Sequence, residues 1–125
     1  MNRSVAGVGL GMTAGEVRSR LGAPALSTGT GGSRDLVYRD RGLVVTLAHA
    51  RVVIVSTRSR HERTSRGIGP GSTVGALRRR VPDARCGEKA GVSFCRIGSI
   101  RPGRRSTTFQ IEGGRVVTVT VARGL

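Results

Sequence analysis

Residues 7–17 read GVGLGMTAGEV, and sixty positions later residues 67–77 read GIGPGSTVGAL. Every glycine of the first stretch is matched in the second, and so is its threonine. Further along, residues 45–53 (VTLAHARVV) match residues 109–117 (FQIEGGRVV) at an offset of sixty-four. Such self-similarity predicts a tandem repeat with four extra residues in the middle of its second copy. The expected organisation is a single domain over residues 1–125, with copies at about 7–58 and 67–122 and a linker at about 59–66.

Each copy is expected to begin with a short helix. Thr13 is a suitable N-cap, and Glu16 three residues later completes a capping box. Gly22 then ends the first helix, because glycine readily adopts the left-handed conformation of a C-cap. In the second copy Ser72 or Thr73 occupies the corresponding N-cap. Helices this short are not stable alone, so both must pack on other elements.

Three strands are expected after each helix, because β-branched residues alternate with polar ones there. Gly113-Gly114 is a favourable two-residue hairpin turn, since both glycines can adopt positive φ, and His49-Ala50 is the corresponding tight turn. The predicted fold class is therefore α+β: a tandem duplication of a helix–three-strand unit, with an antiparallel sheet and short helices packed on one face. The predicted strands are residues 36–39, 43–49, 51–57, 92–97, 107–112 and 115–121.

The period of two along each strand assigns the faces of the sheet. Phe109, Ile111 and Val117 are expected in the core, whereas Gln110 and Thr118 are expected on a face open to water. The first copy has a more apolar open face, which is typical of an interaction surface unless a loop, a terminus or a second subunit covers it. Its predicted positions are Val44, Thr46, Ala48, Val52, Ile54, Ser56 and Arg58.

The chain is strongly basic, with 22 Lys and Arg residues against 7 Asp and Glu and a formal net charge of +15. Such a charge attracts polyanions, including nucleic acid and acidic envelope polymers. The alternative is that the arginines reflect the codon usage of a GC-rich genome and form a solvated surface. Clusters lie in residues 58–66, 78–80 and 101–105, and the last two are candidates to flank a groove for a polyanion. The candidate contacts there are Arg78, Arg79, Arg101, Arg104 and Arg105.

The stretch from Gly11 to Pro24, GMTAGEVRSRLGAP, resembles the G-M-T-x-x-E-V-x-x-x-L-G-x-P opening of the small outer-membrane assembly lipoproteins. It is also similar to the opening of the tandem-repeat β-lactamase inhibitor proteins, and the chain resembles arginine-rich secreted proteins of high-GC Gram-positive bacteria. The resemblance implies short helices preceding an antiparallel sheet. The second copy departs from the motif, with Ala76 in place of Glu16. The inhibitor proteins bind their enzyme with an aromatic-rich sheet. On the open face of this chain Tyr38 is the one aromatic residue expected, which argues against such inhibition.

Cys86 and Cys95 are the only cysteines, and eight residues separate them. In a secreted protein they are expected to form a structural disulfide. A redox or metal role is the alternative, but it requires Cys-x-x-Cys spacing or nearby histidine partners. The disulfide predicts an extracytoplasmic location, with a signal peptide removed from this chain; a cytoplasmic location is the alternative.

His49 and His61 are the only histidines, and neither lies in a catalytic or metal-binding pattern. The sequence therefore predicts no catalytic residue, metal, cofactor or membrane span. The predicted function is a non-enzymatic extracytoplasmic module that binds a protein or an anionic envelope polymer through its open sheet face and arginine-rich rim. The alternative is a nucleic-acid-associated protein that binds phosphates without sequence preference. The candidate residues on the open face are Tyr38, Thr46, Ile54, Ser56, Arg58, Gln110 and Thr118.

Overall fold

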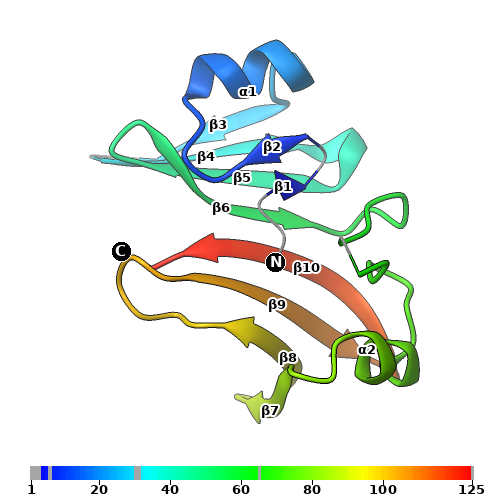
Figure 1. The fold of residues 1–125 in the computed structure, drawn as a ribbon. Helices are drawn as coiled ribbons and strands as arrows, with labels where there is room; N and C mark the ends of the chain where they lie inside the picture. The colour runs from blue at the N-terminus through cyan, green and yellow to red at the C-terminus, as the bar shows by residue number, and fades with distance from the viewer. Residues whose placement is uncertain (1–3, 6, 30–31, 65, 125) are drawn as a thin grey trace.

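The computed structural model describes residues 4–5, 7–29, 32–64 and 66–124, so residue 65 of the expected linker lies outside the described part. Its main element is one eight-stranded antiparallel sheet in the order β3-β4-β5-β6-β10-β9-β8-β7 (Figure 1). Two short helices, a 3-10 helix and a two-stranded sheet accompany it. The elements are β1 (Ser4–Val5), β2 (Val8–Gly9), α1 (Ala14–Leu21), β3 (Leu26–Thr28), β4 (Ser33–Tyr38), η1 (Arg39–Arg41), β5 (Leu43–Ala48), β6 (Arg51–Thr57), α2 (Val74–Arg80), β7 (Arg85–Lys89), β8 (Val92–Gly98), β9 (Arg105–Glu112) and β10 (Arg115–Arg123).

The predicted α+β tandem of helix–three-strand units is wrong. Strand residues far outnumber helical ones, the helices have only 8 and 7 residues, and the sheet is continuous from β6 to β10. Four strands follow each helix, and the missed ones, β3 and β7, form the two edges of the sheet with every residue exposed. A strand exposed on both faces has no hydrophobic alternation, which is why periodicity did not predict it.

Local signals at the helix starts are confirmed. The Thr13 Oγ1 accepts a hydrogen bond from the Glu16 N–H at 3.3 Å, and the Glu16 carboxylate accepts one from the Thr13 N–H at 3.3 Å. The Thr73 Oγ1 likewise accepts the Ala76 N–H at 3.1 Å. Each of these bonds satisfies a donor that has no partner within the helix.

Both helices pack on the same face of the sheet. Val17 of α1 and Leu77 of α2 are each 0% exposed, and each belongs to a cluster of buried strand residues. Val55 and Val121 pair across the seam between β6 and β10, and both belong to the α1 cluster. The α2 cluster continues along β8, β9 and β10 around Phe109.

Two bulges change the predicted faces of β6 and β10. Val53 and Val117 have no partner where the register shifts. Each extra residue breaks the period of two, so Val52 and Val116 point into the core. The predictions that Val52 lies on the open face and that Val117 belongs to the core are therefore wrong. Ala48, also predicted on the open face, is buried.

The predicted two-residue turns are confirmed, and they offer a stability test. Ala50 has φ 66° and Gly114 has φ 75°. Ala50→Gly is expected to raise the free energy of unfolding by up to about 1 kcal/mol, because the relief of left-handed strain exceeds the extra backbone entropy that glycine loses on folding. Gly114→Ala should lower it by a similar amount, and urea unfolding measures both. A loss of stability in Ala50→Gly would contradict this interpretation.

Candidate functional site

We call the face of the main sheet opposite the helices the open face. It carries a row of side chains in direct register across all eight strands, and every one of them is at least partly exposed. Adjacent strands lie about 4.8 Å apart, so this central row extends over roughly 30 Å. From β7 to β3 the central row consists of Arg85, Arg96, Thr108, Thr120, Ser56, Val44, Val37 and Leu26.

The chemistry of the central row changes in steps along its length. Its β7–β8 end is cationic, its middle carries three hydroxyl groups, and its end on β5, β4 and β3 is aliphatic. Leu26 at that end is 42% exposed. The open face is therefore an amphipathic surface with charge at one edge.

Hydrogen bonds fix several side chains of the central row. The Arg96 Nε donates to the Thr108 Oγ1 at 3.0 Å, and the Arg96 guanidinium carbon lies 4.9 Å from the centroid of the Phe94 ring. The Ser56 and Thr120 hydroxyls are 3.1 Å apart across the β6–β10 seam. Arg96 is thus held over the sheet by a hydrogen bond and a cation–π contact. Its other guanidinium nitrogens make no hydrogen bond within the described residues.

Most of the predicted open-face residues do lie on that face. Ile54, Ser56 and Gln110 are half-buried there. The half-buried Thr46 donates its hydroxyl hydrogen bond to the Asp35 carboxylate at 2.7 Å. Thr118 is only 9% exposed, and its hydroxyl has no partner among the described residues.

Tyr38, by contrast, belongs to the core. It is buried in the α1 cluster, and its hydroxyl donates to the Gly22 carbonyl at 2.9 Å. Burial raises the pKa of the Tyr38 phenol, and the positive charges of Arg18 and Arg41 partly oppose that shift. Tyr38 therefore does not offer an aromatic anchor on the open face. Phe94, which sequence reasoning did not select, is the aromatic side chain there.

Phe94, Arg96 and Arg85 are among the open-face residues that sequence reasoning missed. The first two flank the inward-facing Cys95 on β8, so their outward orientation follows from the alternation of that strand. Arg85 lies on the edge strand β7, for which no periodic signal exists. Their proximity results from the pairing of β7 with β8, which is not visible in the sequence.

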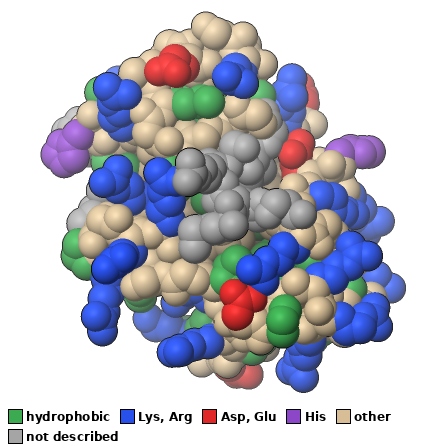
Figure 2. Space-filling model, in the orientation of Figure 1, with side chains coloured by type: hydrophobic (Ala, Val, Ile, Leu, Met, Phe, Trp, Pro, Cys, Tyr) green, Lys and Arg blue, Asp and Glu red, His purple; other side chains and the backbone are tan. Residues whose placement is uncertain are grey.

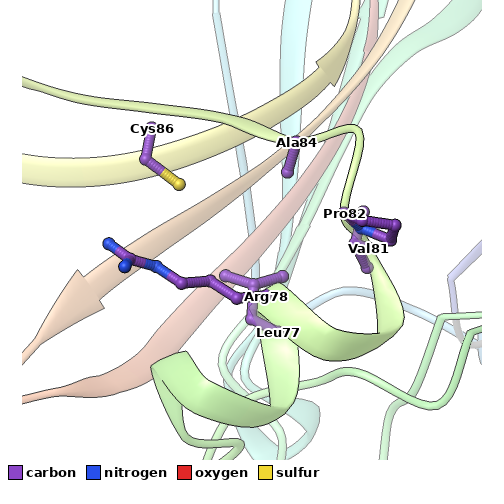
Figure 3. Close-up of a pocket in the computed structure, with 6 residues that line it drawn as sticks. All are labelled: Leu77, Arg78, Val81, Pro82, Ala84 and Cys86. Atoms are coloured by element: carbon purple, nitrogen blue, oxygen red, sulfur yellow. The ribbon is translucent and has the colours of Figure 1, made fainter.

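Five of the six candidate arginines line three separate pockets rather than one groove. Arg101, Arg104 and Arg105 line a pocket of ≈ 450 Å³ with Gly98 and Ser99. The loop that contains them and helix α2 lie at opposite ends of β9 and β10 (Figure 1). Arg78 lines a pocket of ≈ 360 Å³ between α2 and β7, shown in Figure 3 with Leu77, Val81, Pro82, Ala84 and Cys86.

The remaining arginines are spread over the surface. Arg79 is exposed on α2, and Arg58 lines a third pocket, of ≈ 410 Å³, with Arg60 and Arg115. Figure 2 shows basic side chains scattered over the visible face, most of them in its lower half, and few acidic ones. Arg66 and Asp83 form an ion pair, and the hydrogen bond from Arg66 lowers the pKa of the Asp83 carboxyl.

The predicted disulfide is confirmed. Cys86 of β7 and Cys95 of β8 stand directly opposite each other and are covalently joined, with their Cα atoms 4.0 Å apart. Cys86 is exposed on the edge strand, whereas Cys95 is buried in the α2 cluster. The bond therefore fastens the outermost strand to the core.

Neither a metal centre nor a membrane-spanning helix is found in the described part of the chain. No group of three or more His, Cys, Asp or Glu residues there is placed to hold a metal ion. No helix there is long and apolar enough to cross a membrane. His49 lies at the β5–β6 turn, and His61 is exposed in the linker.

No family model and no curated protein matches this sequence. The solved structures that resemble its fold include an extracellular protein containing an SCP domain from Bacillus anthracis and a cysteine-rich secretory protein from Staphylococcus aureus. The first has a TM-score of 0.67 at 11% identity and the second 0.63 at 12%. Each match covers 91% of this chain but 44% of the other, so this chain spans less than half of either structure.

These matches overturn the expected relationship to the β-lactamase inhibitor proteins and the outer-membrane assembly lipoproteins. The matched structures are an SCP-domain protein and a cysteine-rich secretory protein, and their fold differs from that of either group. The misleading motif covers residues 11–24, which form a glycine turn, a capped helix and its C-cap. Such a stretch specifies a helix start on many folds, so it carries local rather than global information.

Proposed function

We propose that this domain is a non-enzymatic, extracytoplasmic binding module, whose open face and arginine-rich rim contact an anionic polymer of the cell envelope. A protein partner with an acidic surface would use the same side chains. The observation that carries the proposal is the central row, in which Arg85 and Arg96 lie in register with hydroxyl groups on a face that neither helix covers. The negative charges of a phosphate polymer attract the arginines, and its phosphate oxygens accept hydrogen bonds from the hydroxyl groups.

Two observations support an extracytoplasmic location. Disulfides persist in oxidising compartments and are rare in the cytosol, and this chain has one between Cys86 and Cys95. The structural neighbours are described as an extracellular protein and a secretory protein. The absence of a catalytic constellation among the described residues favours binding over catalysis.

Binding of a poly(glycerol phosphate) polymer, heparin and double-stranded DNA over a series of salt concentrations tests this proposal. The double variant Arg85→Gln/Arg96→Gln is expected to weaken polymer binding at least about tenfold and to reduce the slope of log affinity against log salt by about 2. The matched control, Arg18→Gln/Arg20→Gln, removes the same charge from α1 on the other face and should have less than about a threefold effect.

The comparison between the two double variants decides the outcome. Equal losses of polymer affinity in the two double variants would show that net charge alone attracts the polymer, and would contradict the assignment of binding to the open face. Affinity for DNA that exceeds affinity for the envelope polymer at every salt concentration would favour the nucleic-acid alternative. Affinity that does not fall as salt rises would exclude polyanion binding altogether.

A further inference from the structure

We propose that the loop of residues 98–105 forms a discrete binding site for a phosphate ester group. The site rests on the proposed function in one respect, because its arginines belong to the arginine-rich rim. It differs from the open face in being a pocket, and it lies where β8 ends and β9 begins. Arg101, Arg104 and Arg105 line this pocket, and no acidic residue does.

The three arginines are available for a ligand. Within the described part of the chain their side chains make no hydrogen bond and no ion pair. Arg105 is half-buried, which reduces the screening of its charge by solvent and salt. Arg123 stands opposite Arg105 in the β9–β10 register and adds a fourth positive charge beside the pocket.

The backbone holds the loop in place before any ligand binds. The Arg104 N–H donates to the Arg101 carbonyl at 3.0 Å, and the Ser99 N–H donates to the Arg105 carbonyl at 3.0 Å. Gly124 fastens the loop to the end of β10, because it accepts from the Gly103 N–H at 2.9 Å and donates to the Arg104 carbonyl at 2.8 Å. A loop fixed in this way loses little entropy on binding.

Gly124 can occupy this position only because it lacks a side chain. A Cβ there would collide with the backbone carbonyls of Arg101 and Ile100. A Gly124→Ala substitution therefore displaces the loop without altering any charge. Displacement of the loop would change the positions of the guanidinium groups relative to one another.

A phosphate ester fits this pocket better than a carboxylate does. Each guanidinium has five N–H donors in one plane, so three guanidinium groups together need hydrogen-bond acceptors that point in several directions. A phosphate monoester offers three oxygens and about −1.5 to −2 charges, whereas a carboxylate offers two oxygens and one charge. Arginine also pairs with phosphate through two parallel hydrogen bonds.

Ile100 distinguishes two sources of the phosphate. It lies in the same loop and is 64% exposed, next to Arg101. An exposed aliphatic side chain among arginines can enter the headgroup region of an anionic bilayer. It contributes nothing to the binding of a soluble phosphate monoester.

Calorimetric titration of the full, disulfide-bonded chain with inorganic phosphate tests the site. The triple variant Arg101→Gln/Arg104→Gln/Arg105→Gln is expected to bind phosphate more than about tenfold more weakly than the wild type. Arg18→Gln/Arg20→Gln/Arg39→Gln removes the same charge from α1 and η1, outside the surfaces assigned to binding, and should bind within about twofold of the wild type. Gly124→Ala, which keeps every arginine, should also weaken binding, with circular dichroism confirming that it folds.

Two results would overturn the site: equal losses in the two triple variants, or no phosphate binding by the wild type. Neither result would affect the proposed function, which depends on polymer binding and on Arg85 and Arg96. Unchanged phosphate binding by Gly124→Ala would overturn the role of the loop geometry. For the source, Ile100→Ser should weaken binding to phosphatidylcholine vesicles that contain phosphatidic acid, a lipid with a phosphate monoester headgroup, if the ligand is a lipid headgroup. It should leave vesicle binding unchanged if the ligand is a soluble phosphate monoester.

Discussion

Replacing Phe109 with alanine is expected to lower the free energy of unfolding by about 3–5 kcal/mol. Phe109 is the largest of the fully buried side chains, and it is 0% exposed. Its cluster otherwise consists of small and medium side chains, among them Leu77, Val116 and Val119, which cannot fill the space of a phenyl ring. A domain of this size has a total stability of about 5–15 kcal/mol, so the variant should be largely unfolded at moderate urea concentrations.

Phe94 provides a matched control for this substitution. It lies on the opposite face of the same sheet, is half-exposed, and contacts the Arg96 guanidinium. Phe94→Ala is expected to lower the free energy of unfolding by about 1 kcal/mol, mainly because the cation–π contact and some buried area are lost. Urea unfolding of both variants measures the difference. Similar losses for the two phenylalanines would contradict the assignment of the core to the face that carries the helices.

The elements that could be predicted from the sequence are those with local signals. The capping box at Thr13 and the glycine turn at Gly113-Gly114 each depend on residues within a few positions of one another. The six predicted strands also form, because each has one buried side and therefore a hydrophobic alternation. None of these signals required knowledge of the fold.

The strand order, the edges and the bulges of the sheet could not be predicted, because these features are not local. The edge strands β3 and β7 bury neither face, so nothing in their composition marks them as strands. The bulges at Val53 and Val117 are set by the partner strands, and they shift the face of every residue on one side of them. The motif at residues 11–24 defined a helix correctly and a fold family wrongly.

The residues of the candidate site also divide into those with a local sequence signal and those without one. Ser56 and Gln110 were placed on the open face by alternation alone, and the structure agrees. Tyr38 was misplaced although it shares its face with Leu36, two residues earlier in the same strand, which is buried. The central row depends on the order of all eight strands, and strand order is a property of tertiary packing rather than of any segment.

Loss of the disulfide is expected to lower the free energy of unfolding by about 2–3 kcal/mol, because the unfolded chain regains the freedom of the loop between Cys86 and Cys95. The double variant Cys86→Ser/Cys95→Ala and the wild type under reducing conditions should both show this loss in urea unfolding. Alanine at residue 95 avoids placing a hydroxyl in the buried position that Cys95 occupies.

The same change should have a local consequence at the edge of the sheet. All residues of β7 are exposed, so that strand has little besides its ladder with β8 and the disulfide to hold it. Its amide hydrogens should therefore exchange faster than before once the bond is lost. The opposite edge strand, β3, is equally exposed but has no disulfide, so its exchange should be the same in both redox states. If β3 and β7 respond alike, the bond acts only on global stability. If β7 alone responds, the bond holds Arg85 in register with Arg96, and the cationic end of the open face then depends on an oxidising environment.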